Sequence, residues 1–257
     1  MTFHPQESLI LASAGADYKI KFWNINTGQT LQTFTGHTGI IRHIALDPQG
    51  KYLASCGLDN TARVWQVNTG ECIAILNHPS PVSSVAFGSK QSILATGSDD
   101  NIVRLWDINT AQILRSFDEH RGWVQSVAFS PNRELLASGS HDGTIKLWQS
   151  NQKQAGATFE HGGWVRAIAF RTCPITSQLQ LVSGSQNGTI KLWDINSRSC
   201  IKTFNPPRPY SQMNITGVTG LSESEKATLI ALGAIETNVL AKDNVVYLRQ
   251  FLSKKSI

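Results

Sequence analysis

A tryptophan recurs at a nearly constant spacing along most of this 257-residue chain. The five positions are Trp23, Trp65, Trp106, Trp148 and Trp193, separated by steps of 42, 41, 42 and 45 residues. Self-similarity at a fixed period indicates a repeat architecture, in which each copy is one structural unit that stacks on its neighbours. The chain is therefore expected to fold as a series of similar units.

Each copy contains four short runs that have the composition of β-strands. In the third copy these runs are VSSVAF, SILATGS, IVRLWDI and QILRSF. Such runs alternate or are continuously apolar over four to seven residues, and Gly, Asn, Asp or Pro bounds them. Tight turns such as NTG at 26–28 and 68–70 join successive runs into antiparallel hairpins. Four short strands in a period of just over forty residues predict a blade of a β-propeller.

The clearest copy, HRGWVQSVAFSPNRELLASGSHDGTIKLW at 120–148, resembles the WD40 repeat. The resemblance covers roughly residues 1–204 and implies an all-β, WD40-type propeller of five four-stranded antiparallel blades. The expected copies span approximately 1–35, 36–77, 78–118, 119–160 and 161–204. An insertion, RTCPITSQ, accounts for the one longer step of 45 residues.

Five copies leave the ends of the propeller open to interpretation, because WD40 rings usually have seven blades. The alternatives are a closed ring of five, an arc sealed by residues 205–257, assembly with another chain, and a piece of a longer protein. An open arc would expose apolar blade faces at both ends, which favours self-association.

The repeat pattern stops after Phe204, and residues 205–257 have a different composition. NPPRPYSQ is a proline-rich linker that cannot continue a ladder. Ser222 and Glu225 form a capping box before an apolar run, which predicts a helix over 223–232 that ends near Gly233. The alternative is a degenerate sixth blade within 213–251, and VVYLRQF at 245–251 is expected to form a short strand. The segment resembles tails that follow the last repeat in bacterial WD40 proteins, including those fused to signalling ATPases.

A His, a Ser or Thr, an Asp or Asn and a Trp recur in the same order within each complete copy, at a fixed spacing that only the insertion in the last copy lengthens. The sets are His37, Ser55, Asp59 and Trp65; His78, Thr96, Asp100 and Trp106; His120, Ser138, Asp142 and Trp148; and His161, Ser183, Asn187 and Trp193. Ser, His and Asp are also the members of a hydrolase triad. A nucleophile is needed only once, however, whereas this set recurs. The WD40 resemblance implies instead a structural tetrad, in which the Asp orients the His and the His reaches the hydroxyl beneath the indole.

The sequence favours no catalytic residue, metal site or cofactor. The expected innermost strands, 40–46, 82–87, 124–129 and 164–170, contain no Asp or Glu, so they cannot supply the paired carboxylates of a glycosidase. Phosphate-loop, His-Glu-x-x-His and G-x-S-x-G motifs are absent from the sequence. The four cysteines form no Cys-x-x-Cys pair, which favours reduced structural thiols.

The repeat positions that face a partner in WD40 relatives carry two tryptophans outside the tetrads. Because those relatives commonly bind peptides or protein surfaces on the narrow face of the disc, the expected binding residues are Trp123, Trp164, Arg166, Arg42, His141 and Gln125. Exposed Trp beside Arg is typical of binding hot spots. Arginine further favours an acidic or phosphorylated partner. The alternative is that both tryptophans simply pack over neighbouring loops.

The net charge of +5 and the pI near 9.1 suggest a nucleic-acid-binding module as an alternative function. One basic residue stands two positions before each repeat tryptophan: Lys21, Arg63, Arg104, Lys146 and Lys191. Such regular spacing is typical of a solvated strand face rather than a binding stripe. No run of eighteen apolar residues is present, and the N-terminus does not resemble a secretion signal. We therefore expect a cytoplasmic, non-catalytic scaffold that binds a protein or peptide, with a regulatory fragment of a signalling ATPase as a further alternative.

Overall fold

The computed structural model describes residues 1–88, 92–132, 134–149, 155–206 and 213–236. The chain divides into two compact units, Met1–Phe204 and Asn205–Ile257. Each unit is described by itself below.

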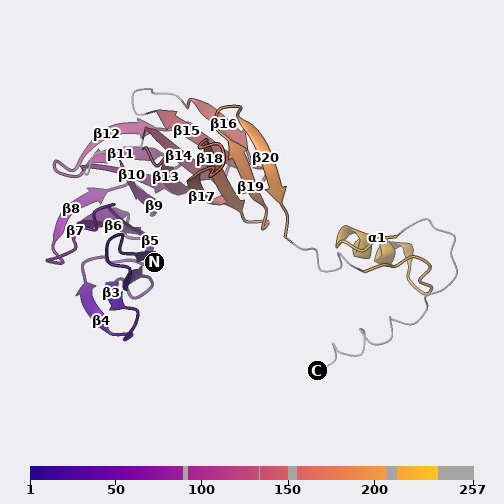
Figure 1. Ribbon diagram of the computed structural model, residues 1–257, viewed down its shortest axis with the longest axis horizontal. Coiled ribbons are helices and arrows are strands. Elements are labelled where there is room, and N and C mark those ends of the chain that lie inside the picture. Colours follow the sequence, from indigo (N-terminus) through magenta and orange to yellow (C-terminus); the bar gives the residue numbers. More distant parts are fainter. Residues whose placement is uncertain (89–91, 133, 150–154, 207–212, 237–257) are drawn as a thin grey trace. The chain divides into compact units, whose positions relative to one another are not determined.

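The first unit consists of five antiparallel sheets of four strands, each of which is one blade (Figure 1). Blade 1 contains β1 (Thr2–Phe3), β2 (Ile10–Ala14), β3 (Ile20–Asn24) and β4 (Thr30–Phe34), and blade 2 contains β5 (Ile41–Leu46), β6 (Tyr52–Gly57), β7 (Thr61–Gln66) and β8 (Cys72–Asn77). Blade 3 contains β9 (Val82–Phe87), β10 (Ile93–Ser98), β11 (Val103–Asp107) and β12 (Gln112–Phe117). Blade 4 contains β13 (Val124–Phe129), β14 (Leu135–Ser140), β15 (Thr144–Gln149) and β16 (Ala157–Glu160), and blade 5 contains β17 (Val165–Thr172), β18 (Leu179–Ser185), β19 (Ile190–Asp194) and β20 (Ser199–Phe204). The prediction of an all-β propeller with five four-stranded blades is confirmed.

The hairpin between the second and third strands has the same backbone in every blade. The residue after the turn Asp or Asn is left-handed, with φ of 61° at Asn60 and 69° at Asn101. Asn tolerates this conformation because its short polar side chain bonds locally. Tyr18 holds the same position in blade 1 with φ of 61°, which costs on the order of 1 kcal/mol. The turn therefore fixes the register that places each His–Ser–Trp set.

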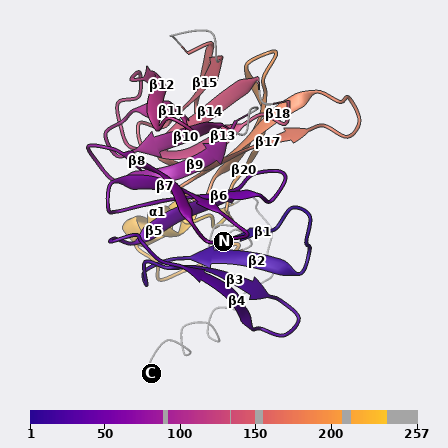
Figure 2. The ribbon, with the colours of Figure 1, turned by 90° about the vertical axis from the view of Figure 1, so that its left-hand side faces the viewer.

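Apolar side chains are buried between successive blades rather than inside any one of them. We call the face that a blade turns to the next blade in the chain its outgoing face, and the opposite face its incoming face. Each of the four apolar clusters joins the outgoing face of one blade with the incoming face of the next. Between blades 3 and 4, Phe117 stacks on Trp148 with ring centroids 4.6 Å apart. Figure 2 shows the sheets of the first unit following one another in chain order. Each blade is thus stabilised by its neighbours.

The innermost strands are linked by side chains that bond the amide of the next blade. His43 Nδ1 accepts from Val85 N at 3.3 Å, Ser84 Oγ from Val127 N at 3.1 Å and Ser126 Oγ from Ile168 N at 3.2 Å. His43 also lines a cavity of about 460 Å³ along these strands. Burial lowers the pKa of His43, which keeps its Nδ1 free to accept.

The five blades form an arc (Figure 1) whose two end faces are less covered than the faces within it. In blade 5, Ile190 is 45% and Phe204 46% exposed, whereas Phe159 at the position of Phe204 in blade 4 is 2% exposed. In blade 1, Phe3 is 61% exposed.

The second unit contains one helix among its described residues, α1 (Glu223–Ala231), where the sequence predicts a helix over 223–232. Ser222 is the N-cap, and its side chain and that of Glu225 form the expected capping box. Ile215 and Ala234 are buried, and Asn214 makes an isolated parallel bridge to Ile235. The predicted strand at 245–251 lies outside the described residues. Within the described ranges, no helix is long and apolar enough to cross a membrane.

Candidate interaction face

The tetrad forms a continuous hydrogen-bonded chain in blades 2 and 4. In blade 4, His120 Nδ1 lies 2.8 Å from Asp142 Oδ2 and its Nε2 lies 2.7 Å from Ser138 Oγ. The indole of Trp148 donates to the same Oγ at 2.8 Å. Blade 2 has the same contacts, with His37 at 2.7 Å from Asp59 and 2.6 Å from Ser55. These chains satisfy buried polar groups that cost about 1–3 kcal/mol each when unpaired.

Blade 3 departs from the expected chain. His78 Nδ1 bonds Leu76 O at 3.0 Å instead of Asp100, and Asp100 lies 2.7 Å from Arg104. The cause is the segment after the His. In blades 2 and 4 the carboxylate also accepts the amide of the residue after the His, Thr38 or Arg121, but Pro79 has no amide hydrogen.

Blade 3 also lacks the glycine that, two residues after the His, lets the chain approach the turn between the second and third strands. A Cβ on Gly122 would lie 2.7 Å from Asp142 N, so only Gly allows this approach. Ser80 is the counterpart of Gly122 in blade 3. Without its carboxylate partner, His78 is simply desolvated, and burial lowers its pKa to about 4.

The terminal blades have the least complete chains. In blade 5 Trp193 donates to Ser183 at 2.8 Å, but neither ring nitrogen of His161 has a partner among the described residues. Asn187 bonds Ser185 and the amide of Thr189 instead. In blade 1 Trp23 donates to Ser13 at 2.7 Å, and Asp17 pairs with Lys21. Asn in place of Asp removes the charge that holds the His in blades 2 and 4.

None of the tetrads has the geometry of a hydrolase triad. Ser138 is completely buried, so a substrate has no access to its hydroxyl, and the same oxygen is already bonded to the His and the indole. Among the described residues, no group of three His, Cys, Asp or Glu side chains is placed to hold a metal ion.

Outside the tetrads, Trp123, His141 and Trp164 form a stack that crosses from blade 4 to blade 5. The His141 ring lies 4.5 Å from Trp164, almost parallel at 11°, and 5.2 Å from Trp123 at 31°. The backbone sets this arrangement, because His141 N bonds Trp123 O at 2.9 Å. We call Trp123, His141, Trp164 and Arg166 the aromatic stripe.

The aromatic stripe combines exposed indoles with one available cation. Trp123 is 49% and Trp164 47% exposed. The Arg166 guanidinium lies 5.7 Å from the Trp164 ring centroid, and among the described residues it donates a hydrogen bond to Gln186 Oε1 at 3.3 Å. A cation over an indole face is a favourable contact worth about 0.5–1 kcal/mol at an exposed site.

His141 is held neutral within this stripe. Its pKa is lowered first by burial between the rings and then by the positive charges of Arg166 and Arg42, against the opposing effect of Asp99. Its Nε2 is buried and has no hydrogen-bond partner among the described residues. Trp123 and Trp164 are half-exposed, and their indole N–H groups make no hydrogen bond within the described part of the chain, so three polar atoms are left without protein partners there.

The other two expected binding residues are already engaged. Arg42 Nη1 bonds Ser83 Oγ at 2.7 Å and both oxygens of Asp99 at 3.0 and 2.9 Å. Gln125 donates to the same Ser83 hydroxyl at 3.3 Å. Asp99 therefore neutralises the charge of Arg42, and a role for Arg42 in binding stays a prediction. Sequence reasoning had not selected Asp99 or Ser83, although both occupy the same repeat positions as His141 and Gln125.

The basic residues before the repeat tryptophans are each bonded within the chain. Lys21, Arg63 and Arg104 each lie within 4.0 Å of the turn Asp four residues earlier. Lys146 lies 3.7 Å from Glu119, and Lys191 donates to His161 O at 2.8 Å. Four of these charges are thus neutralised by carboxylates, which leaves no free basic stripe along this row.

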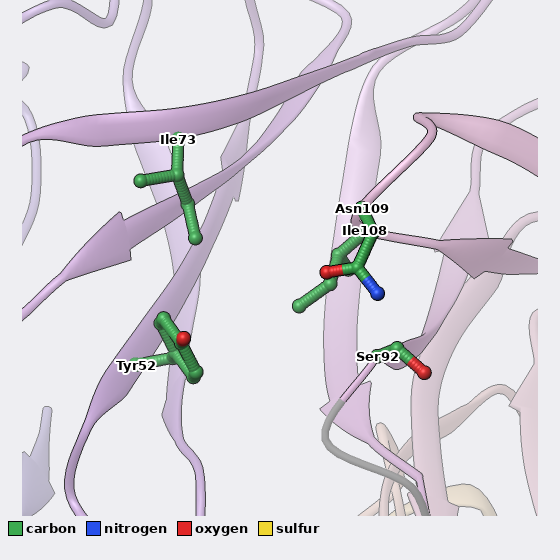
Figure 3. Close-up of a pocket in the computed structure, with 5 residues that line it drawn as sticks. All are labelled: Tyr52, Ile73, Ser92, Ile108 and Asn109. Atoms are coloured by element: carbon green, nitrogen blue, oxygen red, sulfur yellow. The ribbon is translucent and has the colours of Figure 1, made fainter.

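A small hollow lies between blades 2 and 3, and none of its lining residues belongs to the aromatic stripe. Figure 3 shows Tyr52 and Ile73 facing Ser92, Ile108 and Asn109 across this hollow of about 280 Å³. Its lining carries no charged group, so no chemistry follows from it.

The fold and the site together define a propeller-type repeat module with a buried polar frame and an exposed aromatic face. A family model described as WD domain, G-beta repeat matches residues 28–66, 70–107, 111–149 and 153–194, more than half of the chain. The chain belongs to the WD40 repeat family. Each matched repeat begins near the outermost strand of one blade and ends with the third strand of the next, so the repeat itself ties neighbouring blades together.

Curated relatives match a stretch about one repeat long. Nuclear distribution protein PAC1 of Arthroderma benhamiae is 41% identical over 49 residues, 19% of this chain and 11% of the relative. The Lissencephaly-1 homolog of Caenorhabditis briggsae is 46% identical over 44 residues, 17% of this chain and 11% of the relative. The matched part is thus a small fraction of each relative. Since WD40 proteins are generally non-catalytic scaffolds that bind proteins or peptides, the family supports a protein-interaction scaffold at this coarse level.

Proposed function

We propose that this chain binds a protein segment with an acidic or phosphorylated residue, and that the aromatic stripe is the centre of the contact. The observation that carries the proposal is the exposure of Trp123 and Trp164 beside Arg166, whose charge no carboxylate neutralises among the described residues. Half-exposed indoles beside an available guanidinium have the composition of an interaction hot spot.

The unused polar atoms favour an anionic group over a nucleobase. The indole N–H groups of Trp123 and Trp164 and the Arg166 guanidinium are donors, which suit a carboxylate or a phosphate. His141 already covers one face of each indole. Arg166 lies over the Trp164 ring as well, which reduces the ring surface on which a base could stack, whereas a peptide can contact the exposed ring edges.

The neighbouring Arg42–Asp99 pair has a different role in the proposal. Because Asp99 neutralises Arg42, this pair does not attract an anion by net charge. It holds Ser83 and Gln125 in fixed positions next to the stripe, where they contribute hydrogen bonds to the bound backbone. Arg166 is accordingly the residue that sets the preference for a negative charge.

The test is selection of displayed random peptides that carry phosphoserine, glutamate or alanine at a fixed central position. We expect enrichment of the phosphoserine and glutamate libraries by the wild type, and loss of that enrichment in Trp123→Ala/Trp164→Ala. The matched control is Ile113→Ala/Leu114→Ala, two exposed apolar residues on β12, which should bind as the wild type does. Equal enrichment of all three libraries would overturn the acidic preference.

A nucleic-acid function is tested with a labelled single-stranded RNA. Phosphate-driven binding weakens steeply with ionic strength, so tight, salt-sensitive binding that survives loss of both tryptophans would replace the proposal. A cytoplasmic location and the likeness of residues 205–257 to the tails of bacterial signalling ATPases remain predictions.

A further inference from the structure

The outgoing face of blade 5 has the composition of a buried interface but lies open. We call its residues Val182, Gly184, Ile190, Leu192 and Phe204 the terminal face. In blade 4 the counterparts of Ile190 and Phe204 are Ile145 and Phe159, and both are completely or almost completely buried under blade 5. The terminal face therefore exposes apolar side chains whose counterparts in the other blades are covered by the next blade.

A glycine in this face leaves a hole that is filled elsewhere in the arc. A Cβ on Gly97 would lie 2.7 Å from Val124 of the next blade, and a Cβ on Gly139 would lie 2.6 Å from Val165. The glycine thus lets a β-branched side chain enter the sheet surface. Gly184 holds the same register position in blade 5, but a Cβ there would meet nothing within 4 Å.

The hole at Gly184 lies next to a protruding side chain on the same face. Gly184 and Ile190 are direct partners in the β18–β19 ladder, so their Cα atoms lie only about 5 Å apart. Ile190 is β-branched like the valines that fill the other two holes. A hole beside a matching protrusion is self-complementary under a two-fold axis that passes between them.

We propose that two copies of this chain pair through the terminal face, with each Ile190 in the Gly184 hole of the partner subunit. Phe204, the ladder partner of Ile190 on β20, then packs beside the axis. Lys202 stands on the same face, at the register position that buried Ala157 has in blade 4. Its Nζ lies 4.9 Å from the Phe204 ring centroid, and its long stem can pack on the face while the ammonium reaches water.

A two-fold pairing is favoured over a continuation of the arc by a second copy. The hole at Gly184 and the protruding Ile190 belong to the same face of blade 5, as a contact between two identical surfaces requires. The two-fold arrangement directs the two arcs away from each other, and C₂ dimers are the commonest oligomers.

The experiment is sedimentation equilibrium of the full chain over a range of concentrations. We expect a monomer–dimer equilibrium for the wild type. Gly184→Val fills the hole without an internal clash and should raise the dimer dissociation constant by at least about tenfold, since overpacking acts twice in a symmetric interface. The matched control is Gly15→Val, because a Cβ on Gly15 also meets nothing within 4 Å and Gly15 lies in blade 1.

Ile190→Asp is a second variant that should also abolish pairing, and the melting temperature of each variant shows whether it folds. A wild type that stays monomeric at all concentrations would overturn the proposal, as would a dimer that Gly184→Val leaves unchanged. Larger assemblies that Phe3→Asp removes but Gly184→Val does not would show a head-to-tail contact instead. Peptide selection on the aromatic stripe should be unaffected by Gly184→Val, so the two proposals can fail separately.

Discussion

The tetrad of blade 4 leads to a quantitative prediction for Asp142→Ala. Asp142 accepts four hydrogen bonds, from His120 Nδ1 at 2.8 Å, Arg121 N at 2.9 Å, Thr144 N at 2.9 Å and Thr144 Oγ1 at 2.7 Å. The His120 side chain is completely buried, so its Nδ1–H would be left without an acceptor. That orphaned donor costs about 1–3 kcal/mol. The bonds from Arg121 and Thr144 lie nearer to solvent, and water can replace part of them.

The expected loss for Asp142→Ala is about 2–4 kcal/mol in the free energy of unfolding. For a unit of about 200 residues each kcal/mol lowers the melting temperature by about 2–4 °C, which gives a decrease of roughly 4–16 °C. Asp142→Asn keeps the acceptor but removes the charge, so its effect should be intermediate.

The matched control is Asp17→Ala. Asp17 is the turn carboxylate of blade 1, but blade 1 has no His, and Asp17 is bonded only to exposed Lys21 and the amide of Lys19 among the described residues. Its removal should leave the melting temperature close to that of the wild type, because exposed ion pairs contribute little. The assay is urea unfolding followed by circular dichroism, with the slope on denaturant used to check that both variants unfold in the same transition. Equal losses for Asp17→Ala and Asp142→Ala would refute the reasoning, since the two differ mainly in the buried His.

Three further predictions concern single side chains. The pKa of His78 is about 4 in the folded chain against 6.5 for the free group, so the unfolded chain binds the extra proton between these values. The free energy of unfolding should therefore fall by about 3 kcal/mol as pH drops from 6.5 to 4. In His78→Gln the free energy of unfolding, measured by urea titration at each pH, should depend less steeply on pH. Asn187→Asp supplies the carboxylate that His161 lacks, so it should raise the melting temperature at pH 6. An unchanged melting temperature would contradict this prediction. Hydrogen bonds from the Thr176 side chain and from the backbone amides of Thr176 and Ile175 lower the pKa of Cys173 to about 7, whereas burial raises that of Cys56. Iodoacetamide at pH 7 should therefore modify Cys173 in the folded chain and leave Cys56 untouched until urea is added, as read by peptide mass spectrometry.

Much of the frame could be predicted from the sequence because it follows from local rules. The spacing of Trp65 and Trp148 indicates the period, and alternating apolar runs between turn residues indicate the strands. The departure in blade 3 also had a readable signal, since Pro79 cannot donate and Ser80 is not glycine. The resemblance to the repeat implied a uniform tetrad, and only residue-by-residue chemistry shows where that uniformity ends.

The binding residues were harder to predict because their state depends on neighbours from other blades. Arg42 and Arg166 occupy the same repeat position, yet Asp99 of blade 3 neutralises Arg42, while Arg166 faces Gln186 and Trp164. Charge pairing between residues 57 positions apart has no signature in local sequence. The stack of His141 between two indoles has the same origin, since Trp164 comes from the following blade.

The sequence by itself determined the repeat, the four-stranded blade and the residue types at each repeat position. These depend on turn chemistry and on a two-residue alternation, which act over a few neighbouring residues. Only the tertiary structure decided which charges are neutralised, which tryptophans stay exposed and where the apolar faces end. Those properties depend on what the next blade places against each side chain, and contacts between blades are made by residues about forty positions apart in the chain.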